Sequence, residues 1–328
     1  MDPPPSSLVS DVKPAMPRAR QTRAELPYRV AYSTKFGKMV QGSADDVLSS
    51  PLVEKYRGKV QLIFTSPPFP LNRKKRYGNL QGAEFRHWLA GFSGVFRKML
   101  QADGSIVIEM GNAWEAGRPV MSTLALRTLL DFLESGDFYL CQQFVSFNKA
   151  RLPTPAQWVN VKRIRVKDAF THIWWMSPTP QPKADNRRVL GAYSASMEKL
   201  LASKIYNSGA RPSEHHIGAS SFLRNNRGSI PSNVLPVTNT SASDDYLRYC
   251  RKEHLLVHPS RMPIELAEFF VNFLTDRRDI VLDPFAGSNT TGAAAERLRR
   301  RWISIEAEED YVEGSRGRFP SLDKRVKR

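Results

Sequence analysis

The stretch that decides the fold is Asp279-Ile280-Val281-Leu282-Asp283-Pro284-Phe285-Ala286-Gly287-Ser288-Asn289-Thr290-Thr291-Gly292. Its pattern predicts a short buried strand over 279–283, a turn of small residues over 284–292 and a helix over 293–298. A second strand is expected over 302–306, ending at Glu306. A tight turn between strand and helix places backbone N–H groups beside a ligand, and an acid ending the next strand can accept hydrogen bonds from a ribose. The stretch therefore predicts an α/β fold that binds a nucleoside.

The composition of this turn limits which nucleoside it can hold. It has one glycine where the dinucleotide fingerprint has three, and no lysine follows as in a P-loop. Dinucleotide and nucleoside-triphosphate cofactors therefore fit poorly. We expect a nucleoside cofactor without a pyrophosphate.

Strands and helices alternate along most of the chain. Apolar runs predict strands over 60–64, 105–110, 138–147 and 171–176, with a hairpin or strand in 28–42. Helical spacing predicts helices over 44–48, 82–100, 120–133 and 264–274. This alternation is typical of an α/β fold with a mostly parallel sheet. Trp174 and Trp175 lie in an apolar run, and we expect them in the core.

A second chemically suggestive stretch, Thr65-Ser66-Pro67-Pro68-Phe69, follows the strand predicted over 60–64. Two consecutive prolines fix two φ angles and hold Ser66 extended. The turn therefore presents a hydroxyl, free carbonyls and an aromatic ring at the end of a strand. On this stretch alone, a turn that merely ends the strand is an equal alternative.

Composition points to a polyanionic partner. The 328 residues include 49 Lys and Arg against 32 acidic residues, which gives a net charge of +17. Such a charge attracts nucleic acid first and anionic membrane second. No segment is apolar enough to span a membrane or to form a signal peptide, so we expect a cytoplasmic protein.

Metal and disulfide chemistry are not expected. Cys141 and Cys250 are the two cysteines, too few for a disulfide framework or a zinc site. His215, His216 and His258 have no acidic or cysteine partners at ligand spacing.

Together, 65–69 and 283–291 resemble the S-adenosylmethionine-dependent amino-methyltransferases of DNA, and in particular the cytosine-N4 enzymes of restriction-modification systems. The resemblance covers nearly everything from Tyr32 to Phe319. The catalytic motif precedes the cofactor motif, which is the circularly permuted, β-type order of that family. The resemblance implies a Rossmann-like fold with a mostly parallel seven-stranded sheet and a small irregular target-recognition insert.

The resemblance also implies how 65–69 acts on a cytosine that has left the duplex stack. The Ser66 hydroxyl and the Pro67 carbonyl would accept hydrogen bonds from the N4 amine, and Phe69 would stack on the base. Pro68 completes the predicted catalytic set. Transfer would be direct, with no covalent enzyme intermediate. Ser at the first motif position is the family's usual marker for cytosine over adenine.

The cofactor pocket carried over from the family comprises Asp283, Phe285, Gly287, Ser288, Asn289 and Thr290 around the methionine and sulfonium, Glu306 on the ribose, and His258, Ser260 and Arg261 around the methionine end. Relatives often place Gly-Asp before the catalytic strand, with the acid near the adenine. Here the matching pair is Gly42-Ser43, followed by Asp45 and Asp46. Which of Ser43, Asp45 and Asp46 replaces that acid stays open.

Basic side chains outside the pocket are the predicted DNA contacts. They are Arg73, Lys74, Lys75 and Arg76 in a loop that would close on phosphates, and Lys162, Arg163, Arg165, Arg187, Arg188, Arg224 and Arg227. Solvated loop surface is the alternative for each of them. Asn148 matches a family position near the flipped base, with a turn residue as an equal alternative.

The predicted organisation is a disordered arm over 1–27, a catalytic domain over 28–177 and 256–320, a target-recognition region over 178–255 and a basic tail over 321–328. The predicted function is a site-specific cytosine-N4 DNA methyltransferase, with an adenine-N6 enzyme or an inactive DNA-binding relative as alternatives. Expected partners are double-stranded DNA and S-adenosylmethionine, with a cognate restriction endonuclease sharing the site. The protein is expected as a monomer or homodimer in the bacterial cytoplasm, nucleoid-associated when acting.

Overall fold

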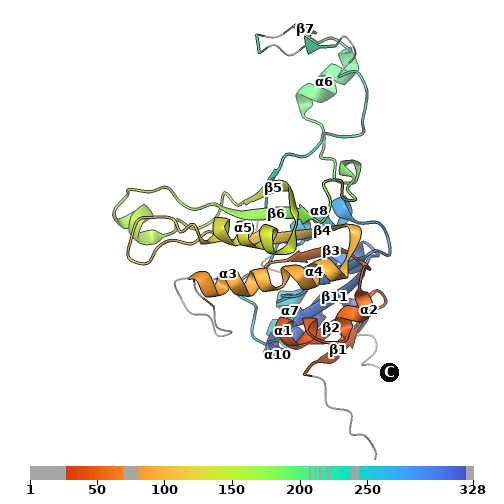
Figure 1. Cartoon of the computed structure of the whole chain (residues 1–328). Helices are drawn as coiled ribbons and strands as arrows, with labels where there is room; N and C mark the ends of the chain where they lie inside the picture. The colour runs from red at the N-terminus through yellow and green to blue at the C-terminus, as the bar shows by residue number, and fades with distance from the viewer. Residues whose placement is uncertain are drawn as a thin grey trace, which may run out of the picture.

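A nine-stranded sheet forms the centre of the chain, in the order β1-β2-β11-β10-β3-β4-β6-β5-β9 (Figure 1). The computed structural model describes residues 27–69, 80, 82–206, 208–210, 212, 213, 216–218, 220, 222–237 and 244–322. The strands of this sheet are β1 (Arg29–Ser33), β2 (Gly37–Gln41), β3 (Val60–Thr65), β4 (Leu100–Met110), β5 (Tyr139–Phe147), β6 (Phe170–Ser177), β9 (Val234–Pro236), β10 (Ile280–Asp283) and β11 (Arg301–Glu306). A separate pair comprises β7 (Gly209–Ala210) and β8 (His216–Ile217).

The pairing confirms a mostly parallel sheet. Strands β2, β11, β10, β3 and β4 run parallel to one another, and β6 is antiparallel between β4 and β5. The predicted count of seven omits two edge strands: β1 pairs antiparallel with β2, and the three-residue β9 adds to β5. β9 was missed because it has only three residues and lies in 178–255, where the sequence predicted no strand. The late β10 stands between β11 and β3, as the permuted motif order requires.

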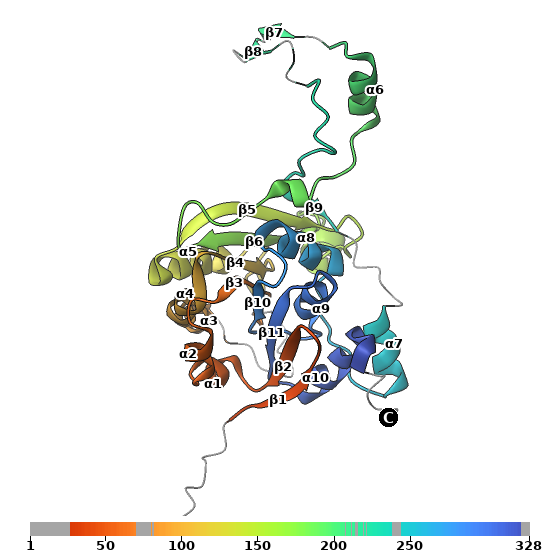
Figure 2. The same ribbon diagram turned by 90° about the vertical axis from the view of Figure 1, so that its right-hand side faces the viewer.

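Helices cover both faces of the sheet (Figure 2). One face carries α1 (Ala44–Leu48), α2 (Leu52–Tyr56), α3 (Gly82–Gly91), α4 (Ser93–Met99) and α5 (Leu124–Gly136); the other carries α8 (Ile264–Leu274), α9 (Thr290–Arg297) and α10 (Glu309–Ser315). Successive side chains of a strand point to opposite faces. Accordingly, Ile63 belongs to the first core cluster, whereas Leu62 and Phe64 belong to the second. Trp174 and Trp175 are buried, one in each cluster, which confirms their predicted core role.

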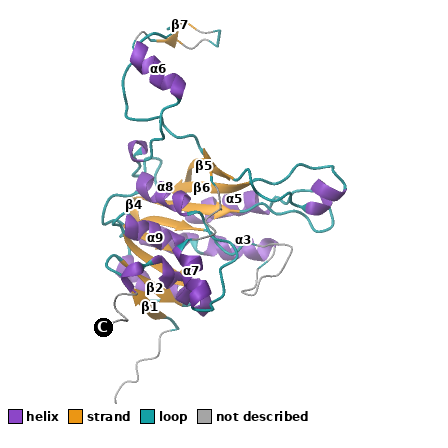
Figure 3. Cartoon of the chain, turned by 180° about the vertical axis from the view of Figure 1, so that it is seen from behind, coloured by secondary structure: helices purple, strands orange, loops and turns teal. Residues whose placement is uncertain are grey.

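Two segments project from this body (Figures 1 and 3). The loop 148–169 joins β5 to β6 and carries the π-helical turn η1 (Gln157–Val161). The lobe with α6 (Ala195–Ser203), β7 and β8 extends away from the sheet. The remainder of 178–255 lies on the body, because β9 joins the sheet and α7 (Asp245–Lys252) contacts the turn η3 (Arg316–Arg318).

The predicted helix over 82–100 is wrong in one respect: it divides into α3 and α4 at Phe92. Gly91 and Gly94 flank the break, and glycine is a poor helix former. The short 3-10 turn η2 (Asn186–Arg188) completes the described elements. In the described part of the chain, no helix is long and apolar enough to cross a membrane. The arm 1–26 and the tail 323–328 lie outside the described residues.

Candidate active site

A cavity of about 670 Å³ runs along the carboxyl edge of the sheet. Its wall includes Glu306 at the end of β11, Asp283 at the end of β10, Ser66 after β3 and Glu109 near the end of β4. Ligands of open α/β sheets bind at this edge, and the volume is within the range of about 300–1,000 Å³ typical of small-molecule sites. The fold thus brings together two motifs that lie more than 200 residues apart.

Asp283 is a buried carboxyl group in the floor of this cavity. Its Oδ1 accepts hydrogen bonds from Thr65 Oγ1 at 2.7 Å and from the Phe285 N–H at 3.2 Å. Burial raises the pKa of Asp283 to about 6, although these hydrogen bonds act in the opposite direction. A cation bound beside Asp283 would favour the ionised form and offset the cost of desolvation.

The cofactor turn is tight because Gly287 adopts a left-handed conformation, with φ +51°. A Cβ on Gly287 would lie 2.8 Å from His258 Nε2, so a larger residue would also displace His258. The Gly287 N–H donates to Glu306 Oε2 at 2.6 Å, and the Glu308 N–H donates to Oε1 at 2.9 Å. Burial raises the pKa of Glu306.

Most predicted cofactor residues line the cavity. They are Asp283, Phe285, Gly287, Ser288, Thr290, Glu306, His258, Ser260 and Arg261. Asn289 is the correction: it is fully buried and absent from the cavity wall. Its side chain caps α9 by accepting from the Gly292 N–H and also bonds to Tyr32 and Ser304. Asn289 therefore shapes the turn from behind.

Ser43 and Asp45 line the cavity, whereas Asp46 does not. Ser43 caps α1 by accepting from the Asp46 N–H, and its hydroxyl donates to Asp46 Oδ2 at 2.7 Å. Asp45 Oδ2 accepts from Trp88 Nε1 at 3.3 Å. The Trp88 ring lies 5.2 Å from the Phe285 ring, so an acid and two aromatic rings form this end of the cavity.

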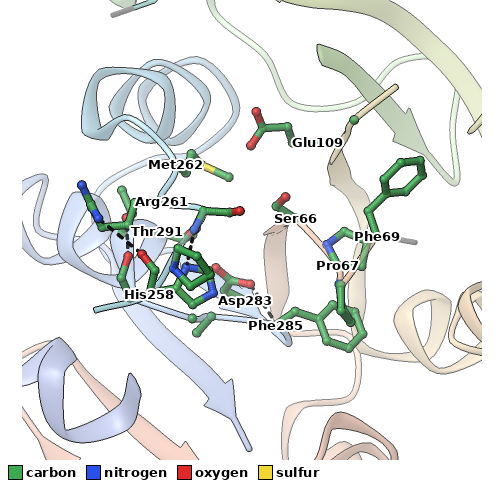
Figure 4. Close-up of a pocket in the computed structure, with 18 of the residues that line it drawn as sticks. Ser66, Pro67, Phe69, Glu109, His258, Arg261, Met262, Asp283, Phe285 and Thr291 are labelled. Carbon is green, nitrogen blue, oxygen red and sulfur yellow. Dashed lines mark hydrogen bonds between the residues drawn. The ribbon is translucent and has the colours of Figure 1, made fainter. Parts of the chain in front are cut away.

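The turn 66–69 also lines the cavity, close to this aromatic group, because the Phe85 ring contacts both Phe69 and Trp88. Ser66 is exposed, Pro67 is buried, and the Phe69 ring meets the Phe85 ring edge-on at 5.8 Å. Figure 4 shows Ser66 with Glu109 and Asp283 around the same cavity. The predicted catalytic residues, including Pro68, all contribute to its wall.

Glu109 was missed by sequence reasoning. It lies in the cavity wall, and its Oε1 accepts from Thr171 Oγ1 at 3.0 Å. Burial raises the pKa of Glu109, while Thr171 and Arg151 lower it. An acid inside the apolar run 105–110 was the available signal, because a charged residue is seldom buried without a partner or a function.

Arg318 was also missed, and it supports the cofactor turn from the C-terminal end of the chain. Its Nε donates to the Ser288 carbonyl at 2.6 Å, and its Nη2 donates to Ser288 Oγ at 3.1 Å. The guanidinium also lies 3.6 Å from Asp244, the N-cap of α7, and over the Tyr246 ring. The Tyr246 hydroxyl in turn accepts from the His258 N–H at 2.8 Å.

The predicted DNA contacts are distributed unevenly. Lys162, Arg163 and Arg165 are exposed on the loop 148–169, and Arg224 and Arg227 are exposed in 178–255. Arg187 and Arg188 lie at the amino edge of the sheet, where Asp185 pairs with both. Arg188 also bonds to Thr275 and Asp276 before β10.

Arg73, Lys74, Lys75 and Arg76 lie outside the described residues. Asn148 and Arg151 line the cavity at the root of the loop 148–169. Among the residues that the structure describes, no three His, Cys, Asp or Glu side chains are grouped to hold a metal ion.

The geometry agrees with comparisons to known proteins. A family model described as DNA methylase matches residues 60–316. The type II methyltransferase M.PvuII of Proteus hauseri is 43% identical over 291 residues, covering 88% of this chain and 85% of the relative. M.HindIII of Haemophilus influenzae is 27% identical over 251 residues, 72% of this chain and 70% of the relative.

Solved structures show the same fold. The PvuII DNA methyltransferase, described as cytosine-N4-specific, has a TM-score of 0.70 at 37% identity and covers 88% of each chain. TTHA0409 of Thermus thermophilus, complexed with S-adenosyl-L-methionine, shares the fold at a TM-score of 0.52 and 20% identity, over 86% of this chain and 92% of that one. With its family model, its relatives and its cavity in agreement, this chain belongs to the DNA methylase family of N6- and N4-amino-methyltransferases.

Proposed function

We propose that the protein is a site-specific DNA methyltransferase that transfers a methyl group from S-adenosylmethionine to the N4 amine of a cytosine in a short double-stranded site. The observation that carries the proposal is that one cavity joins the turn 66–69 to the turn 284–291. Similarity to a cytosine-N4-specific enzyme over 88% of the chain supports the same assignment. Ser66, in place of the Asp or Asn of adenine enzymes, favours cytosine.

The cavity has the groups that S-adenosylmethionine requires. When bound, the cofactor supplies a methyl group activated by a sulfonium. Asp283 gives a negative charge for the cationic methionine end, beside His258 and the Gly287 turn. The Glu306 oxygens retain lone pairs for ribose hydroxyls, because a carboxylate accepts about four hydrogen bonds. Asp45, Trp88 and Phe285 form the end suited to an adenine, and Asp45 takes the place of the acid that relatives carry.

The turn 66–69 and Glu109 position the amine and remove its proton. Ser66 Oγ and the Pro67 carbonyl accept hydrogen bonds from N4, which aims the nitrogen lone pair at the methyl carbon. Once methylated, N4 would be cationic and would have to give up a proton to a residue of the cavity. Glu109 lines the same cavity as Ser66 and its strand β4 lies beside β3, so we assign it as the acceptor of that proton. Catalysis is then positioning and electrostatics.

We propose the following finer assignments as well. The catalytic domain comprises 28–177 and 256–320, and target recognition is the role of 178–255, with most contacts from the projecting lobe. A cognate restriction endonuclease recognises the same DNA sequence, and it need not bind the methyltransferase. The methyltransferase acts as a monomer or homodimer, associated with the bacterial nucleoid.

Single-molecule methylation sequencing tests the proposal. Plasmid DNA incubated with the protein and S-adenosylmethionine is expected to carry a modified cytosine in every copy of one short sequence. The Ser66→Ala variant, which retains the cofactor cavity, is the matched control and is expected to leave most copies unmodified. Absence of any modified base from the wild-type reaction, with cofactor binding intact, would contradict the proposal.

A further inference from the structure

The loop 148–169 combines exposed apolar side chains with a dense positive charge. Leu152 is 77% exposed and Val166 is 87% exposed, and Val161 and Ile164 are exposed as well. Residues 149–167 contain six Lys or Arg residues and no Asp or Glu. A single exposed apolar residue is ordinary, but a group of them indicates a surface that is covered when a partner binds.

The root of this loop forms part of the cavity wall. Arg151 and Thr154 on one side, and Asp168 on the other, line the cavity. Leu152 lies between the first two, and Val166 lies two residues before Asp168. The two most exposed apolar residues of the loop are therefore within two residues, along the chain, of residues that line the cavity.

Hydrogen bonds hold the two sides of the root together. The Asp168 N–H donates to the Thr154 carbonyl at 3.0 Å, and Lys167 Nζ donates to the Lys149 carbonyl at 2.7 Å. Asn112 Nδ2 reaches Asp168 Oδ1 at 2.8 Å, and Arg151 Nη1 reaches the Phe170 carbonyl at 2.9 Å. These bonds join the root to β6 and to the end of β4, so Leu152 and Val166 keep a fixed place beside the cavity.

We propose that Leu152 and Val166 enter the DNA at the target site and occupy the space that the flipped cytosine leaves in the stack. The inference rests on the proposed function, because a cytosine must leave the duplex to reach Ser66. The gap that it leaves is lined by the apolar faces of the neighbouring bases. Apolar side chains fill such gaps in proteins that unstack DNA. The surrounding Lys and Arg side chains suit the flanking phosphates.

The charge of the loop 148–169 favours DNA over a second copy of this chain as the partner that covers its apolar side chains. Two copies meeting through 149–167 would bring twelve cations together, with Asp168 as the one acid of each loop 148–169. Like charges in contact oppose association. A DNA duplex offers negatively charged phosphates for the cations, and next to them the apolar gap that the flipped base leaves.

The test compares two duplexes that contain the recognition sequence and differ only opposite the target cytosine. In one duplex the cytosine is paired with guanine, and in the other it faces an abasic site, which lowers the cost of flipping. Single-turnover methylation is measured with S-adenosylmethionine at saturation. The Leu152→Ala/Val166→Ala variant is expected to lose about tenfold in rate on the paired duplex and to retain nearly the wild-type rate on the abasic duplex.

Two further variants serve as controls. Leu152→Met/Val166→Ile preserves apolar volume and is expected to match the wild type on both duplexes. Ile205→Ala removes a side chain that is 79% exposed on the lobe, and it is expected to leave the ratio of the two rates unchanged.

An equal loss on both duplexes, or no loss on either, would overturn the proposal. A change in molecular mass by light scattering with unchanged rates would assign the loop to self-association instead. If the wild-type protein methylated neither duplex, the proposed function would fail, and this inference would fail with it.

Discussion

At the scale of single residues, one buried carboxyl group, Asp283, and two half-buried ones, Glu306 and Glu109, line the cavity. Asp283, Glu306 and Glu109 each have a raised pKa, and burial is the largest cause in every case. Desolvation disfavours the charged form of an acid, whereas a nearby cation restores it. A cationic ligand bound in the cavity would therefore favour the ionised form of these carboxyl groups.

Replacement of Asp283 tests this charge balance. Because the pKa of Asp283 is raised, its protonated carboxyl group stabilises the fold fully below the unfolded pKa of 3.8. This stabilisation is lost as pH rises through the folded pKa of about 6. At pH 7.5, Asp283→Asn without cofactor is therefore expected to gain up to about 3 kcal/mol in free energy of unfolding, from about two pKa units. Its affinity for S-adenosylmethionine should fall. Chemical denaturation and calorimetry measure both quantities, with the exposed Glu198→Gln as control; wild-type affinity in the Asp283 variant would contradict the assignment.

Glu109→Gln tests the proton acceptor. Only the ionised carboxylate accepts a proton, so the single-turnover rate of the wild type should fall as pH decreases through the raised pKa of Glu109. The variant should be slower and should lack this dependence, with cofactor affinity near wild type. An unchanged rate and pH profile in the variant would remove Glu109 from the mechanism.

The residues that could be predicted from sequence are those with a local signature. Ser66 and Asp283 stand in short motifs with a fixed order, and both line the cavity. Asn289 belongs to the same motif, yet its side chain turns inward to cap α9. Arg318 has no local signature, because its partner Ser288 is 30 residues away in sequence and close only after folding.

At the scale of elements, the cofactor turn is held between α9 and the C-terminal turn η3. Arg318 in η3 donates two hydrogen bonds to Ser288, and Tyr246 in α7 accepts from the His258 backbone. Elements that are distant in sequence thus fix both sides of the methionine end.

Arg318→Lys tests whether this support reaches the cofactor. Lysine keeps the charge but cannot reproduce the planar pair of donors. We expect cofactor binding to weaken by about 1–3 kcal/mol, the range for losing hydrogen bonds from a charged group. Arg316→Lys, in the same turn but paired with Glu313, is the matched control and should bind normally. Lower stability with unchanged cofactor affinity would make Arg318 a purely structural residue.

The sequence predicts whether a segment is a helix or a strand where its apolar residues are regularly spaced, but it does not predict where that element begins and ends. The helix predicted over 82–100 breaks at Phe92, which packs against Trp88, Phe96 and Phe285. Gly91 and Gly94 weaken the helix at this point and the packing of Phe92 accompanies the break, so the spacing of apolar residues alone does not reveal it. β9 has three residues, and its place beside β5 depends on long-range pairing.

At the scale of the whole molecule, part of the charge of +17 lies on the loop 148–169, where residues 149–167 include six Lys or Arg and no Asp or Glu. The loop 148–169 and the lobe with α6, β7 and β8 extend from the body in different directions (Figure 1). Arg187 and Arg188 instead pair with acids at the amino edge. We therefore propose that the loop 148–169, more than the amino edge, contacts DNA.

The salt dependence of DNA binding measures that assignment. Lys162→Gln/Arg165→Gln should reduce the slope of log affinity against log salt by about 1.8, because each lost phosphate contact contributes about 0.9. Arg187→Gln, at the other edge, should leave the slope unchanged. The reverse pattern would place the DNA on the amino edge.

The identity of the methylated base tests the central claim most directly. DNA incubated with the protein and S-adenosylmethionine is digested to nucleosides and analysed by mass spectrometry. We expect N4-methylcytosine from the wild type and a strong decrease from Ser66→Ala with cofactor affinity intact. N6-methyladenine as the sole product would contradict the assignment of Ser66, Pro67 and Phe69 to a flipped cytosine.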